Sequence, residues 1–97
     1  MNTFESLRQI LNASILDGVI TRKEILEKTG GWKHTYNTVD NYRNWFTKAG
    51  YLIVLRPGVY HMVKAAPFGL TGTMLRKQAY PDYYNNPHKK FRHESSI

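Results

Sequence analysis

Asparagine recurs along one face of a predicted helix. Asn37, Asn41, Asn44 and Lys48 are separated by four, three and four residues, which is the spacing of a single helical face. Each side-chain amide carries both hydrogen-bond donors and an acceptor. Asparagine is a weak helix former, so it is a poor choice for a face that only meets water. The stripe is therefore a candidate binding face, with a solvated surface as the plain alternative.

Other site chemistry is poorly represented. The sequence has no cysteine, which excludes a disulfide scaffold, a thiolate zinc site and a cysteine nucleophile. The four histidines lack metal-ligand spacing, no serine lies in a nucleophile motif, and GGWKHT lacks the spacing of a phosphate-binding glycine loop. The sequence predicts a protein that is not an enzyme and has no metal site and no cofactor.

The positive charge is unevenly distributed. The net charge is +7, from 14 Lys and Arg against seven Asp and Glu. Residues 1–30 hold four basic and four acidic side chains, so the whole excess lies after residue 30. A basic surface attracts polyanions, although charge also serves solubility.

The size and hydropathy of the chain indicate one small domain. Ninety-seven residues suffice for a single modest core. The N-terminus lacks the pattern of a signal peptide, and no apolar run approaches the roughly 20 residues of a membrane span. We expect a cytoplasmic protein with no membrane partner.

Two helices are predicted in the first third of the chain. Apolar residues at helical spacing indicate a helix over about 3–16, with Thr3 available as its N-terminal cap. A short apolar step follows. Thr21 and Glu24 have the spacing of a capping box, which opens a second helix that ends near Lys28.

A third helix is predicted from about Thr35 to Gly50, since glycine is typical of the position after a helix end. Its core face is opposite the asparagine stripe. The residues expected in the core are Val39, Tyr42, Phe46 and Ala49.

A β-hairpin should follow, because the apolar runs YLIVLR and VYHMVK flank Pro57-Gly58. With Arg56 opposite Val59, the register counts back to Leu55–Tyr60, Ile53–Met62, Leu52–Val63 and Tyr51–Lys64. Both faces of such a hairpin are apolar, so a further layer is expected over the second face.

Residues 67–97 differ in composition, with aromatic residues, prolines and a basic end. One short helix, 73–79, is predicted before Pro81. The apolar residues expected to cover the hairpin, in the same chain or in a partner subunit, are Phe68, Leu70, Met74, Leu75 and Tyr80.

The order helix, short strand, helix, helix, hairpin is that of an α+β winged helix-turn-helix domain. The stretch NTVDNYRNWFTKAGYL resembles the third helix of winged-helix transcription regulators. AGYLIVLRPGVYHM is similar to the wing of antitoxin-type winged helices related to abortive-infection systems, in which Gly-Val-Tyr follows the tip. The resemblance covers about residues 3–64. It implies three helices, a two- or three-stranded antiparallel wing, a domain over 1–66 and a C-terminal extension over 67–97.

The resemblance also implies double-stranded DNA as the partner. The third helix would lie in the major groove, with Thr38 on phosphate and with Asn37, Asn41 and Asn44 toward the bases, because an asparagine amide can bond adenine in a bidentate way. Residues expected nearer the DNA backbone or minor groove are Lys33, Thr35, Arg43, Lys48 and Arg56.

Lys89, Lys90 and Arg92 form a basic end that could bind phosphate. The amide-rich face carries little positive charge, so a homodimer is expected to strengthen binding. The function expected is that of a small prokaryotic or phage transcription regulator. The alternative is a winged helix used as a protein-interaction module, such as a phage-encoded inhibitor of a host enzyme that docks through the hairpin outer face and the tail.

Overall fold

The computed structural model describes residues 2–30 and 36–82. Its elements, in chain order, are α1 (Thr3–Ser14), β1 (Ile20–Thr21), α2 (Arg22–Thr29), α3 (Tyr36–Lys48), β2 (Leu52–Arg56), β3 (Val59–Met62) and α4 (Gly72–Ala79). The strands form one antiparallel sheet in the order β1-β3-β2. The chain is thus α+β, as its sequence predicts. No helix in the described part of the chain is long and apolar enough to cross a membrane.

Local sequence signals set the helix ends. The predicted capping box is confirmed: the Thr21 hydroxyl accepts from the Glu24 N–H, and the Glu24 carboxylate accepts from the Thr21 N–H. The predicted cap of α1 was wrong by one residue. Asn2 is the N-terminal cap, because its backbone is extended and its Oδ1 accepts from the Glu5 N–H at 2.7 Å, whereas Thr3 already lies in the helix.

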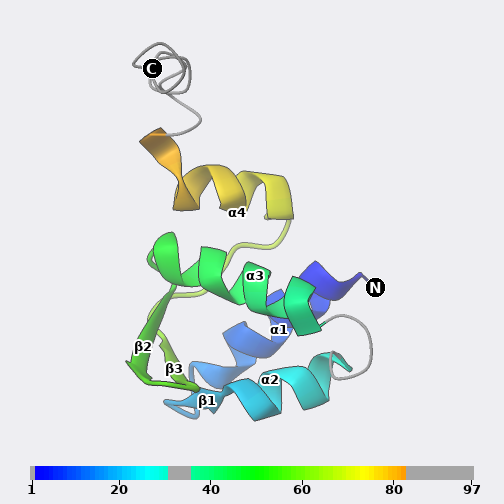
Figure 1. Cartoon of the computed structure of the whole chain (residues 1–97), viewed down its shortest axis with the longest axis vertical. Helices are drawn as coiled ribbons and strands as arrows, with labels where there is room; N and C mark the ends of the chain where they lie inside the picture. The colour runs from blue at the N-terminus through cyan, green and yellow to red at the C-terminus, as the bar shows by residue number, and fades with distance from the viewer. Residues whose placement is uncertain (1, 31–35, 83–97) are drawn as a thin grey trace, which may run out of the picture.

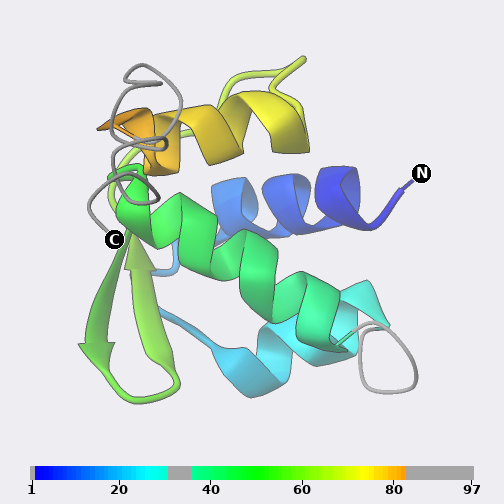
Figure 2. The same ribbon diagram turned by 45° about the horizontal axis from the view of Figure 1, so that its top comes forward.

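Helix α3 runs through the middle of the molecule (Figures 1 and 2). It lies across α1, with α4 along one side, α2 along the other and the β2–β3 hairpin beyond its C-terminal end. The face of α3 that points away from α1 is not covered by another described element.

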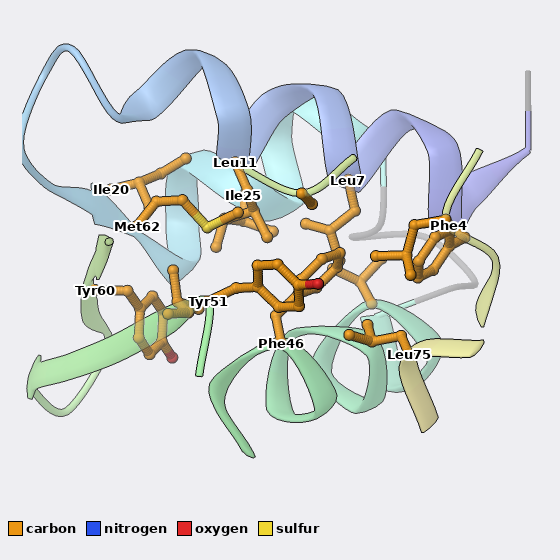
Figure 3. Packing of buried hydrophobic residues seen from close by; sticks show 14 of the residues in the cluster. Phe4, Leu7, Leu11, Ile20, Ile25, Phe46, Tyr51, Tyr60, Met62 and Leu75 are labelled. Atoms are coloured by element: carbon orange, nitrogen blue, oxygen red, sulfur yellow. The ribbon is translucent and has the colours of Figure 1, made fainter. Parts of the chain in front are cut away.

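The core gathers around α3 (Figure 3). Phe46 is fully buried, and its ring stacks on Phe4 of α1 at 5.6 Å between centroids and meets Tyr51 edge-on at 5.9 Å. Leu7, Leu11, Ile25 and Leu26 from the first two helices and Leu52, Tyr60 and Met62 from the sheet close this core. The predicted core stripe is confirmed, with Val39 and Phe46 buried and Tyr42 and Ala49 packed against them.

The predicted hairpin register was wrong beyond the tip. Arg56 pairs with Val59 as expected, but Leu55 is an extra, bulged residue, so Val54 pairs with Tyr60 and Leu52 with Met62. The burial of side chains explains this register. It brings Leu52 and Met62, each 1% exposed, together on the inner face of the sheet.

The predicted cover over the second hairpin face was also wrong for the described residues. Leu70 and Leu75 are buried in the common core, and α4 packs along α3 rather than over the hairpin. Phe68 and Met74 stay exposed, as do Ile53 of β2 and Val63, which directly follows β3. Helix α4 instead adds a fourth helix to the same core.

A side-chain clamp holds the chain after the hairpin. The Asn12 amide donates to the Ala66 carbonyl at 2.9 Å, and the Asn12 carbonyl accepts from the Ala66 N–H at 2.8 Å. The buried Arg8 guanidinium also donates to the Ala66 carbonyl, at 3.3 Å. These contacts fix where the chain turns toward α4.

Replacing Asn12 by Ala should lower the free energy of unfolding by about 1–3 kcal/mol, because it leaves buried backbone groups of Ala66 without full partners. Urea unfolding followed by circular dichroism measures the change. Gln9→Ala, at an exposed position on the same helix, is the matched control and should stay within about 0.5 kcal/mol of the wild type. Equal losses for the two variants would contradict the clamp.

Candidate nucleic-acid interface

The asparagine stripe lies on the uncovered face of α3. Asn37, Asn41 and Lys48 are exposed and Asn44 is half-buried. Packing of the opposite face explains this orientation, since Val39 and Phe46 are both fully buried. The structure therefore brings four of the predicted site residues together on one helical face.

The Asp40 carboxylate of α3 forms an ion pair with Arg22 of α2. Asp40 accepts two hydrogen bonds from Arg22, from Nε at 3.0 Å and from a terminal nitrogen at 2.9 Å. Hydrogen bonding to this carboxylate raises the pKa of Arg22 above its ordinary value. The bidentate pair links α2 to α3 and offsets the only acidic charge on α3.

Arg43 is engaged inside the structure. Its guanidinium lies 4.8 Å from the centre of the Tyr60 ring, and its Nε lies 3.9 Å from Asp40. The side chain is only 19% exposed, and the buried Nε has no hydrogen-bond partner. Arg43 thus joins α3 to the sheet and presents less charge to the surface than its position in the sequence predicts.

Thr38 is exposed but lies to one side of the stripe. It lines an open hollow of about 630 Å³ between the start of α1, α3 and the start of α4. Asn2 and Thr71 also line this hollow, and their side chains are already used as helix caps. The hollow therefore borders the uncovered face of α3.

The tip of the hairpin carries an exposed cation. Arg56 is exposed and precedes Pro57-Gly58, where Gly58 adopts φ +78°, as the predicted turn requires. The hairpin continues the chain directly from the C-terminal end of α3, so Lys48 and Arg56 mark the two ends of one continuous segment.

Helix α4 supplies further candidate residues that the sequence did not identify. The Arg76 guanidinium lies 5.7 Å from the Trp45 ring of α3, and the Lys48 ammonium lies 5.6 Å from the Tyr80 ring. Lys77 is exposed on the same short helix. The signal was present in the sequence as an Arg-Lys pair within a predicted helix, but its position beside α3 depends on tertiary packing.

Further candidates lie outside the described residues, namely Lys33, Thr35, Lys89, Lys90 and Arg92. Within residues 2–30 and 36–82, no group of three or more His, Asp or Glu side chains could hold a metal ion. His61 of β3 donates through Nδ1 to the Gly18 carbonyl, which gives that histidine a structural role.

Comparison of the chain with protein-family models, with curated proteins and with solved structures found no match.

The Arg22–Asp40 pair should orient α3 with little effect on stability. Its side chains are 40% and 26% exposed, so solvent screening limits the coupling free energy to about 1 kcal/mol or less. A double-mutant cycle with Arg22→Ala and Asp40→Ala, which compares the free energies of unfolding of the four proteins, measures this coupling. A cycle that pairs Arg22→Ala with Glu27→Ala, an exposed acid on α2, is the control and should give no coupling. Coupling well above that limit would show that the pair holds the fold itself.

Proposed function

We propose that this chain is a winged helix-turn-helix protein that binds double-stranded DNA as a small transcription regulator. Helix α3 is the recognition helix and enters the major groove, and the β2–β3 hairpin is the wing. The observation that carries the proposal is the uncovered face of α3, where Asn37, Asn41 and Lys48 stand outward from a helix anchored by Val39 and Phe46.

The polar chemistry of this face suits base recognition. An asparagine amide matches the donor and acceptor pair that adenine presents in the major groove, and one such pair discriminates by about 1–3 kcal/mol. Neutralisation of Asp40 by Arg22 removes a charge that would otherwise repel phosphates.

Cations flank the face on two sides. Arg56 at the hairpin tip suits phosphates or the negative potential of a narrow minor groove. On the opposite side, Arg76 of α4 lies against Trp45 of α3, Tyr80 lies against Lys48, and Lys77 is exposed on the same short helix. These cations would position the protein on the duplex backbone while the amides read the sequence.

A protein-interaction module is the second candidate. It is favoured by the engagement of Arg43 with Tyr60 and Asp40, which leaves Lys48 as the one exposed basic residue of α3 in the described chain. An amide-rich face with few cations is compatible with a protein partner.

Binding to duplex DNA across a salt series tests the proposal. The logarithm of the affinity should fall linearly with the logarithm of salt concentration, and Lys48→Ala, Arg56→Ala and Lys77→Ala should each flatten the slope by about one unit. Lys28→Ala is the control, since Lys28 lies beside Gln9 and Ala13 of α1, away from the uncovered face of α3. Absence of binding at low salt would reject DNA as the partner and favour the protein-interaction module.

Asn41→Ala should have a different effect. An amide that reads a base contributes sequence preference and no counterion release, so the variant should lose about 1–3 kcal/mol on the preferred sequence and keep the wild-type salt slope. Affinity for a selected duplex is compared with affinity for scrambled duplexes. A uniform loss on all of these sequences would remove Asn41 as a base reader.

A further inference from the structure

The free edge of the sheet is apolar. Strand β2 is an edge strand, since only β3 pairs with it among the described residues. Ile53, Val54 and Leu55 are 44%, 50% and 52% exposed, although each is aliphatic. Residues 49–55 carry no charge. Edge strands of folded proteins often carry charges or prolines that prevent pairing with a further strand, and residues 52–54 of β2 carry neither.

The hydrogen bonding of the hairpin shows which groups face that edge. The Val63 N–H donates to the Tyr51 carbonyl at 2.8 Å, so these two residues occupy a hydrogen-bonded site of the ladder. Bonded and non-bonded pairs alternate in an antiparallel ladder. Leu52 and Val54 are therefore in non-bonded pairs, and their N–H and C=O groups point away from β3, toward the free edge.

We propose that β2 pairs with β2 of a second copy of this chain, antiparallel and about a two-fold axis, with Ile53 opposite Ile53. In this register Leu52 pairs with the partner's Val54, and Val54 with the partner's Leu52. All the edge-facing N–H and C=O groups of Leu52 and Val54 then find partners. Ile53 meets its own copy at a non-bonded site, where side chains come closest.

The pattern of charges favours a second copy as the occupant. The same register sets residues 52–54 of one copy, which carry no charge, against the same residues of the other, and the cations nearest to them in each chain, Lys48 and Arg56, lie outside these pairs. No two cations are therefore opposed within the paired segment of these +7 chains. The bulge at Leu55 ends the regular edge just beyond Val54, which limits the pairing to this short segment.

Site-specific cross-linking tests the register. Because the chain contains no cysteine, Ile53→Cys introduces a single thiol. At a non-bonded pair the two Cα atoms lie about 4.5 Å apart, within the range that a disulfide spans. The variant should form a covalent dimer under mild oxidation, and the control Leu16→Cys should do so much more slowly, since Leu16 is 94% exposed and distant in sequence from β2. Equal rates for the two variants would overturn the proposed register.

Sedimentation equilibrium of the full chain tests the association itself. The wild type should show a concentration-dependent monomer–dimer equilibrium. Val54→Pro should be monomeric, because proline removes a donor that faces the partner and spares the β2–β3 ladder. Val54→Lys, which places a charge on the edge, should give the same result with a wild-type circular dichroism spectrum. Leu16→Ser should dimerise as the wild type does.

A wild-type chain that remains monomeric at all concentrations would overturn the inference. The same monomeric result is expected if a different strand covers β2, and it would overturn the inference equally. This outcome would leave the proposed function standing, since a monomer can still show a salt-dependent affinity for DNA. Conversely, a dimer that fails to bind DNA would reject the proposed function alone.

Discussion

The burial of Phe46 is the constraint on which the rest of the structure depends. Its ring stacks on Phe4 of α1 and meets Tyr51 at the start of the sheet, so one side chain ties α3 to both. A helix anchored on that face has no freedom to rotate, because a turn about its axis would expose Val39 and bury polar groups without partners. The outward direction of Asn41 follows directly from this packing.

The cations around α3 fall into two groups, those that connect α3 to other elements and those that lie closer to the surface. Arg22 and Arg43 are held by Asp40 and Tyr60, where they connect α3 to α2 and to the sheet. Lys48 lies closer to the surface, alongside the cations of α4 and the hairpin tip. Such a division between structural and exposed cations lets a basic protein keep a rigid binding helix and still present charge at its rim.

Much of the fold could be predicted because its signals are local. Helical spacing identified α3 and its core face, and the pairing of Thr21 with Glu24 marked the start of α2. The bulge at Leu55 could not be predicted, because the register is decided by joint burial of strand residues against distant helices. The clamp between Asn12 and Ala66 joins residues 54 positions apart, so no short-range sequence pattern predicts it.

The candidate site followed the same rule. The stripe on α3 was predictable from periodicity. The contact of Arg43 with Tyr60 and that of Arg76 with Trp45 depend on how separate elements pack. Helical periodicity contains no information on this packing. The sequence therefore identified the face, whereas the surroundings of Arg43 and Arg76 follow only from the tertiary structure.

Contact of the uncovered face of α3 with DNA, as proposed, can be followed residue by residue in an NMR titration of the labelled protein with duplex DNA. Backbone and side-chain amide signals of Asn37, Asn41 and Lys48 should shift first, together with those of Arg56 and Lys77. Shifts confined to the α1 surface around Gln9, or the absence of any shift at low salt, would contradict the account.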